Sequence, residues 1–274
     1  MGAFNAAITH FFDLICTPFR AFDPIWALLF ISLLAGVLLL WIFGKVSNQT
    51  AIKKIRNIIV GNLWGVWVYQ DHVRVVLNLQ NKIVANTLRY MLHTLIPIAI
   101  LIGPAVLIMS QLNLRLAVRP LAVGETALVK FKVRDAASLT PRIELELPEG
   151  LSLDSPGVHM PEASEVAWRV KAEAPGEYVI KATAGGETLA KQFVAGDRWA
   201  PVSTRRTGTG FFDSILYPGE PPIAQVSIFE SAEIVYQPLE MTMFRIIPVN
   251  WLVGFFILSM VFGFAFKDVL GVEI

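Results

Sequence analysis

The stretch LWIFGKVSNQTAIKKIRN, residues 40–57, changes from lipid-like to water-facing within two residues. It begins with four large apolar residues, whereas Lys45 opens a segment that carries four basic residues and no acid. Only Gly44 separates the two parts, and no proline is present to end a helix. We therefore expect a membrane-spanning helix that leads almost directly into a basic helix in water.

The composition of the whole chain is typical of a membrane protein. Its 274 residues are 54% hydrophobic and only 16% charged, and the mean hydropathy is +0.56. Uncharged apolar runs occupy residues 25–43, 95–112 and 246–266. Each run has roughly the 17–25 residues that a helix needs to cross about 30 Å of hydrocarbon. The sequence therefore predicts three transmembrane helices.

The basic residues between the first two runs predict the orientation in the plasma (inner) membrane. Residues 45–90 hold seven basic side chains against one acid, Asp71. Short basic connections stay in the cytoplasm, so we place the N-terminus and residues 113–245 on the outer side. The basic face suits anionic lipid, with ribosome or nucleic-acid contact as the alternative, although no RNA-binding motif accompanies it. The face consists of Lys45, Lys53, Lys54, Arg56, Arg74, Lys82 and Arg89.

The segments on either side of the first span have helical periodicity. Apolar residues recur at helical spacing in residues 8–22, which predicts a helix lying in the membrane interface, interrupted by Pro18. The same segment contains Cys16, the single cysteine, which we interpret as a packed apolar residue. Residues 45–91 read as two helices that form a cytoplasmic hairpin and bury their apolar stripes against each other, with a partner groove as the alternative. The second helix is expected to run on into the second span.

From residue 114 the apolar period changes from 3.6 to 2, which indicates β-strands. Glycine- and proline-containing turns separate the alternating segments, and Gly185-Gly186 is the expected turn of a hairpin. Six short strands at near-regular spacing favour an immunoglobulin-like β-sandwich. The predicted strands are LRLAV (114–118), ALVKFKV (127–133), RIELELP (142–148), SEVAWRVKA (164–172), GEYVIKATA (176–184) and ETLAKQFVA (187–195), and AEIVYQP (232–238) is expected to return to the membrane.

Residues with catalytic or metal-binding potential are scattered. The four histidines lie in four different regions, so no metal-ligand spacing exists. No serine–histidine–aspartate arrangement and no intramembrane carboxylate pair is present. Gly208 and Gly210 lack the lysine and the helix that would complete a phosphate loop. The sequence therefore predicts a protein that is not an enzyme and needs neither cofactor, metal nor DNA.

The order of these segments resembles the YidC/Oxa/Alb membrane-insertase superfamily, in its small three-span branch with archaeal YidC-like proteins and subunit 3 of the endoplasmic-reticulum membrane complex. The resemblance covers roughly residues 8–112, with the third span at 246–266 in the expected place. In that branch the first span runs into a polar helix that carries an Asn-Gln pair, here Asn48-Gln49, before a helical hairpin leads to the second span. An outer β domain, here between the second and third spans, is similar to one that some bacterial members carry elsewhere in the chain.

The resemblance implies an insertase or insertion chaperone with a polar groove, open to the cytoplasm, among its spans. Such a groove lowers the cost of drawing polar groups into lipid, where each unsatisfied group costs several kcal/mol. The partners implied are membrane lipid and nascent membrane proteins or other membrane subunits. The alternative is a non-catalytic assembly subunit whose outer β domain binds a partner. The few polar residues of the spans are the candidate groove residues: Ser32, Thr94, Ser110, Gln111, Asn250 and Ser259.

The expected fold class is thus an α-helical membrane protein with three spans, a cytoplasmic helical hairpin and an inserted β-sandwich. The segment boundaries are as follows: interfacial helix 1–24, first span 25–44, cytoplasmic hairpin 45–91, second span 92–112, outer β domain 113–245, third span 246–267 and cytoplasmic tail 268–274.

Overall fold

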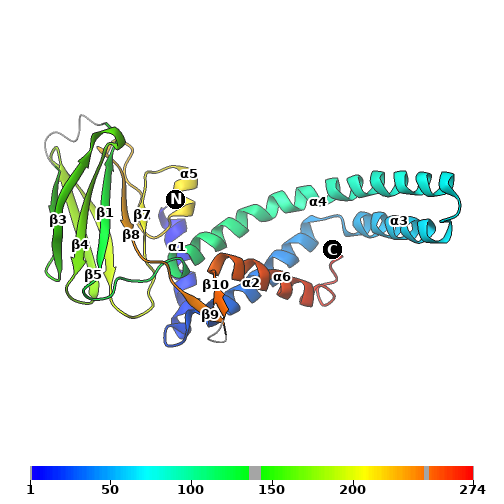
Figure 1. Ribbon diagram of the computed structural model, residues 1–274, viewed down its shortest axis with the longest axis horizontal. Helices are drawn as coiled ribbons and strands as arrows, with labels where there is room; N and C mark the ends of the chain where they lie inside the picture. Colours follow the sequence, from blue (N-terminus) through cyan, green and yellow to red (C-terminus); the bar gives the residue numbers. More distant parts are fainter. Residues whose placement is uncertain (1, 136–142, 244–246, 274) are drawn as a thin grey trace. The chain divides into compact units, whose positions relative to one another are not determined.

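The computed structural model describes residues 2–135, 143–243 and 247–273 (Figure 1). The chain divides into two compact units, one formed by residues 1–28 and 107–252 and the other by residues 29–106 and 253–274. The long helices are α1 (Gly2–Cys16), α2 (Pro24–Val46), α3 (Gln49–Val68), α4 (Val73–Leu116) and α6 (Trp251–Phe266). A single 3-10 turn, η1 (Thr17–Phe19), follows α1 and contains Pro18, where the sequence predicts an interruption.

Helices α2 and α4 are each long and apolar enough to cross a membrane, judged by length and composition. Helix α6 is apolar but has 16 residues, so it is shorter than the third span expected from the sequence. It begins at Trp251, because Pro248 and its neighbours pair as strand β10 (Ile247–Val249) with β9 (Met241–Met243). The expected start at Ile246 lies outside the described residues.

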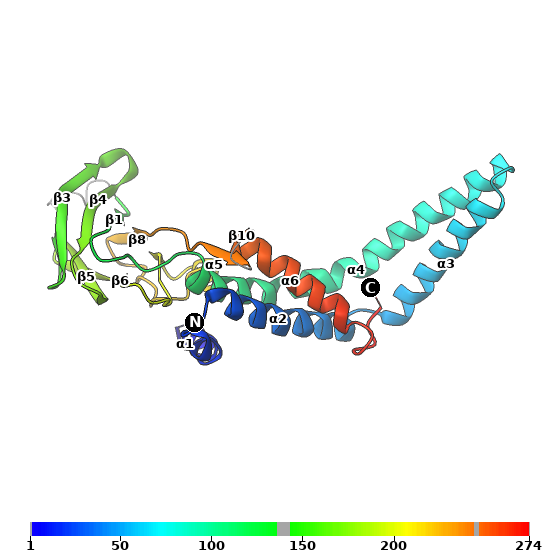
Figure 2. The same ribbon diagram turned by 60° about the horizontal axis from the view of Figure 1, so that its bottom comes forward.

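Helices α3 and α4 form an antiparallel hairpin in the second unit, as Figure 2 shows. The side chain of Asn48 caps α3 by accepting a hydrogen bond from the Ala51 amide at 3.0 Å. Gly65 allows close contact, because a methyl group there would lie 3.0 Å from Leu79. Mutual burial of the two apolar stripes is nevertheless mostly absent. Ile52 is the buried residue of α3, whereas the expected stripe members Leu63, Leu77, Val84, Leu88 and Met91 are exposed.

The β domain lies between α4 and α6 in the chain and contains two main sheets. The larger has the strand order β3-β4-β1-β8-β7, and the smaller has the order β2-β5-β6. All neighbouring strands in both sheets are antiparallel. Their bounds are β1 (Thr126–Val133), β2 (Glu144–Glu146), β3 (Leu151–Met160), β4 (Glu165–Ala172), β5 (Gly176–Ala184), β6 (Glu187–Ala195), β7 (Arg205–Arg206) and β8 (Phe229–Val235).

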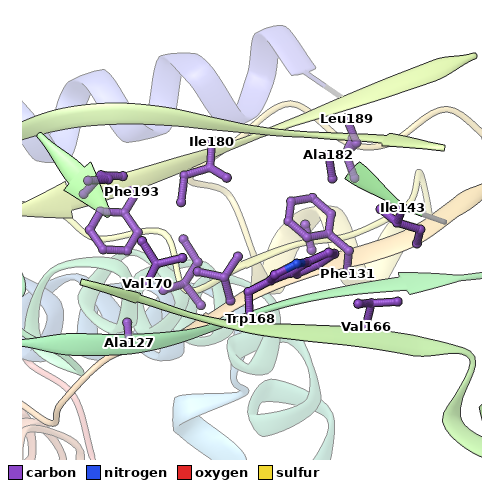
Figure 3. Packing of buried hydrophobic residues seen from close by; sticks show 14 of the residues in the cluster. Ala127, Phe131, Ile143, Val166, Trp168, Val170, Ile180, Ala182, Leu189 and Phe193 are labelled. Carbon is purple, nitrogen blue, oxygen red and sulfur yellow. The ribbon is translucent and has the colours of Figure 1, made fainter. Parts of the chain in front are cut away.

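One apolar core holds the two sheets together. Figure 3 shows Phe131 and Trp168 of the larger sheet pointing toward side chains of β5 and β6, such as Ile180 and Phe193. Phe131 packs edge-on against Trp168, with ring centroids 6.0 Å apart. Strand β1 alternates buried and partly exposed residues, as a strand covered on one face must. The β-sheet region predicted from the period of 2 is therefore confirmed.

Two local expectations about the strands are wrong. The segment 114–118 was expected to be a strand, but α4 continues to Leu116, where Arg115 bonds to Gln111 of the preceding turn and to Asp13 of α1. The segment 151–160, which contains Pro156-Gly157, lies between two of the predicted strands among the glycine- and proline-containing turns, but it forms β3. Two register shifts accommodate this dipeptide, and a side chain at Gly157 would overlap the Trp168 indole.

A buried ion pair interrupts the apolar pattern of β6. Lys191 occupies an inward-facing position and is fully buried, and the Glu220 carboxylate pairs with its ammonium group. The Ser203 carbonyl also accepts a hydrogen bond from Lys191 at 2.6 Å, and the Gln192 amide donates to Glu220 at 3.0 Å. Burial lowers the pKa of Lys191, while Glu220 opposes that shift. The pair therefore ties the segment around Glu220 to β6.

We predict that Lys191→Met lowers the free energy of unfolding of the β domain by about 3–5 kcal/mol, because it leaves the Glu220 carboxylate buried without its cation. The double variant Lys191→Met/Glu220→Leu should recover most of that loss. Lys171→Met serves as the control, since its pair with Glu173 is solvent-exposed and should contribute about 0–1 kcal/mol. Urea unfolding of the full chain, followed by tryptophan fluorescence, measures all three. Equal losses for Lys191→Met and Lys171→Met would contradict the prediction.

Candidate functional site

An apolar groove in the second unit is the candidate site. Its volume is about 380 Å³, and its lining comes from α2, α4 and α6. Among the described lining residues, Ser259 alone has a polar side chain, so the walls are almost entirely hydrocarbon. The lining residues are Gly36, Leu39, Leu40 and Phe43 of α2, Leu101 of α4, and Phe256, Ile257, Ser259, Met260, Gly263 and Phe264 of α6.

Small residues bring α2 and α6 together at this groove. A methyl group on Gly36 would overlap the Ser259 carbonyl oxygen and lie 3.2 Å from the Gly263 amide nitrogen. Ser32 and Gly36 are four residues apart on α2, and Ser259 and Gly263 are four apart on α6. This small-xxx-small spacing places each pair on one helix face and permits close backbone contact in lipid. The larger side chains beside these contacts form the walls.

The structure does not gather the six candidate polar residues around one cavity. Of the three in the second unit, only Ser259 lines the groove, and its hydroxyl donates to the Phe256 carbonyl at 3.2 Å. The Thr94 hydroxyl donates to the Met91 carbonyl of its own helix at 2.9 Å. Ser32 is completely buried, and its hydroxyl has no hydrogen-bond partner among the described residues.

The other three candidates belong to the first unit. Ser110 donates to the Leu107 carbonyl at 2.9 Å within α4. Asn250 accepts a hydrogen bond from the Leu252 amide at 3.0 Å at the start of α6. Gln111 donates to the Thr9 hydroxyl at 3.1 Å, so it connects α4 with α1. Ser110 and Asn250 therefore make local hydrogen bonds at their helices, whereas Gln111 belongs to a separate cluster.

A buried cluster around Arg115 joins α1, α4 and the segment after β6. Arg115 donates to the Asp13 carboxylate at 2.7 Å and to the Gln111 side chain at 2.7 Å, and it lies over the Phe12 ring. Its carbonyl accepts from the Trp199 indole at 2.6 Å. Sequence reasoning missed Arg115 because residues 114–118 were assigned to a strand. The sequence signal for this cluster was a spacing of four residues, which places two side chains on the same helix face. Gln111 and Arg115 have this spacing, and so do Thr9 and Asp13.

Cys16 is buried beside this cluster and is a free thiol. Burial raises its pKa, with the nearby Arg115 cation acting in the opposite direction. The thiol is therefore neutral near pH 7 and packs as an apolar group.

The basic face of residues 45–90 is partly occupied by the chain's own C-terminal segment. Glu273 pairs with Lys53 at 2.9 Å and with Arg56 at 2.6 Å, and its amide donates to Gln49. The hydrogen bond from Lys53 lowers the pKa of Glu273. The other five residues of the basic face form no ion pair with any residue that the structure describes. They are Lys45, Lys54, Arg74, Lys82 and Arg89. Asn48 and Gln49, the pair named in the resemblance, thus have a capping role and a tail-binding role here.

Comparison of the chain with family models, with curated proteins and with solved structures gave no match. The apolar groove and the hairpin beside it in the same unit are therefore the features from which a function can be argued.

We predict that Gly36→Ala lowers the free energy of unfolding by about 1–3 kcal/mol, because the new methyl group overlaps backbone atoms of α6 that cannot yield cheaply. Gly61→Ala on α3 is the matched control. Nothing lies within 4 Å of the methyl group it adds, so its better helix propensity should stabilise the protein by up to about 1 kcal/mol. Unfolding of the full chain in lipid nanodiscs measures both, and changes of the same sign would count against close α2–α6 contact.

Proposed function

We propose that this chain is a membrane-embedded insertion chaperone of the insertase-like type, which holds an apolar transmembrane segment of a client protein in the groove between α2, α4 and α6. The observation that carries the proposal is the lining of that groove, in which Ser259 is the only polar side chain that the structure describes. A volume of about 380 Å³ accepts several large side chains from one face of a helix.

The chemistry of the groove favours recognition by shape. Inside lipid no hydrophobic force drives helices together, so association depends on packing and on close backbone approach. Gly36 and Gly263 already provide that approach between α2 and α6, and Leu39, Phe43 and Met260 provide the surface against which a client segment packs. This mechanism differs from the polar, hydrated path that the resemblance implies, because the candidate hydroxyls of Thr94 and Ser259 are bonded to their own helices.

The short length of α6 supports the same function. Sixteen residues span about 24 Å along a helix axis, against a hydrocarbon thickness of about 30 Å. A bilayer adapts to a short span by thinning beside it. A thinner bilayer next to the groove shortens the hydrocarbon path that a client segment must cross during insertion.

The hairpin offers a second apolar surface in the same unit. Trp64 and Trp67 near the end of α3 are 64% and 69% exposed and stack edge-on with ring centroids 6.1 Å apart. Exposed apolar side chains continue on α4 at Leu88 and Leu92. Large exposed apolar surfaces on a water-facing hairpin mark a site of interaction. In the proposed function this surface receives a client segment before the segment enters the groove.

The proposed arrangement has three spans, formed by α2, the apolar part of α4 and α6, in the plasma (inner) membrane. The hairpin and the C-terminus face the cytoplasm, and the N-terminus and the β domain lie outside. The two facing sheets are proposed to form an immunoglobulin-like sandwich. The excess of basic residues in 45–90 supports this orientation.

A second candidate function is that of an assembly subunit, anchored by its spans and binding a partner through the β domain. The observation that favours it is that the hydroxyls of Thr94, Ser110 and Ser259 donate to carbonyls of their own helices, which suits a close-packed anchor as well as a docking groove. The two candidates differ in whether another protein enters the groove.

For the orientation, we predict that a reporter active only outside the cytoplasm works when it is fused after Asp197 and fails when it is fused after Gln70. The reason is the seven-to-one excess of basic over acidic residues in 45–90, which retains that segment in the cytoplasm. Protease protection of the same two fusions in sealed vesicles is the independent measurement. The reverse pattern would place the hairpin outside and overturn the proposed route of the client.

For the groove, we predict that a photo-crosslinking amino acid at Leu101 or Met260 captures newly made membrane proteins. Both residues line the groove. The matched controls are Leu38 on α2 and Val261 on α6, which are exposed but do not line it, and they should react mainly with lipid. Mass spectrometry of the adducts during synthesis of a short single-span protein measures the difference.

Filling the groove provides the test of mechanism. Gly263→Leu should reduce adducts at Leu101 by about tenfold or more, since it places a large side chain where a client helix would pack. Val261→Leu, on the same helix outside the groove, should leave them unchanged. Equal adduct yields at all four crosslinker positions would reject the groove as a client site and favour the assembly subunit.

A further inference from the structure

The β domain contains a polar pocket that the proposed function does not use. Its volume is about 360 Å³, and its described lining consists of charged residues, polar residues and glycines, with no apolar side chain. It lies at the edge of the larger sheet, where β7 and β8 meet residues 207–210 and the short helix α5 (Phe211–Leu216). A cavity of this size suits a small molecule rather than a chain of protein.

Arg205 on β7 contributes a guanidinium group to the lining of this pocket. Its guanidinium carbon lies 5.6 Å from the centre of the Tyr217 ring, which packs against the group. Its Nε is buried and has no acceptor among the residues that the structure describes. A buried donor without an acceptor is unfavourable. Because Nε lies out of reach of a ligand, the donors that Arg205 can offer in the pocket are its terminal amino groups.

Arg134 contributes a second guanidinium to the lining. Its backbone amide donates to the Ile228 carbonyl and its Nε donates to the Ser227 carbonyl, each at 2.9 Å, so the start and the end of the side chain are held. The terminal amino groups are the donors that remain for a ligand. The hydroxyl-bearing residues Thr207 and Ser231 complete the donor set, and both are largely buried.

The charge balance of the pocket favours an anion. Two carboxylates line it, Glu230 and Asp213, but Glu230 pairs with Lys132 at 3.0 Å. The two guanidinium groups therefore face one carboxylate that has no ion pair among the described residues, which leaves a net positive charge. Arginine binds carboxylate and phosphate groups through two parallel hydrogen bonds, which its two terminal amino groups can supply.

We infer that this pocket binds a small organic anion, a carboxylate or an organic phosphate, through the guanidinium groups of Arg205 and Arg134. The site is independent of the groove, with which it shares no residue. It gives the β domain a ligand of its own, in addition to any protein partner.

Isothermal titration of the full chain in phosphatidylcholine nanodiscs tests this inference, with succinate and glycerol 3-phosphate as the probes. At least one probe should bind, and Arg205→Met should raise its dissociation constant by about tenfold or more. Arg205→Lys keeps the charge but loses the planar fork, so its affinity should be intermediate. Arg169→Met on β4 is the matched control, because its side chain is 56% exposed and lies outside the pocket.

The stability of the ligand-free variants separates a binding role from a structural one. Arg205→Met should unfold at the same temperature as the native chain or higher, because it removes an unsatisfied buried donor. Repeating the titration in discs with phosphatidylglycerol identifies the source of the anion. Weaker probe binding there would assign the pocket to a lipid phosphate, and unchanged binding would assign it to a soluble anion. Absence of binding by both probes up to about 10 mM, or equal weakening by Arg205→Met and Arg169→Met, would overturn the inference.

Discussion

The buried guanidinium of Arg115 is the interaction on which the first unit depends. Removing a charge from water costs several kcal/mol, which the protein must offset with well-placed acceptors. Here the acceptors come from two helices, since Asp13 lies on α1 and Gln111 on α4. The Arg115 carbonyl in turn holds the Trp199 indole from the segment after β6. The charge meets these acceptors only when α1 and the end of α4 are both in place, and the backbone of the same residue holds the segment after β6.

In the second unit the shape of the groove depends on two glycines, which have no side chain. Gly36 and Gly263 let the backbones of α2 and α6 approach closely, and the bulky residues beside them cannot follow into the same space. The groove is therefore a direct consequence of residue size at two helix faces. Its apolar lining follows from the same sequence, because α2, α6 and the part of α4 that lines it consist almost entirely of apolar residues. Polar atoms in such helices bond to their own backbones, as Thr94 and Ser259 do.

Much of the fold could be predicted from periodicity, whereas the sites could not. The two long apolar helices and the β-sheet region follow from hydropathy and from the change of period near residue 114. The end of α4 was missed because the alternation in LRLAV also fits a strand, and tertiary contacts of Arg115 decide for the helix. Strand β3 was missed because Pro156-Gly157 reads as a turn, although bulges absorb it. The groove was predicted to be polar because the sequence shows which residues of an apolar run are polar. It does not show which way their side chains face.

The groove and the polar pocket differ in the chemistry of the ligands that they can accept. Their volumes are nearly equal, about 380 and 360 Å³, yet one presents hydrocarbon and the other presents guanidinium and hydroxyl groups. A charged ligand would lose its hydration in the groove without gaining a partner, and an apolar segment would leave the donors of the pocket unsatisfied. Each cavity therefore excludes the ligand of the other. Because they share no lining residue, a substitution in one changes its own selectivity and leaves the other cavity's chemistry as it is.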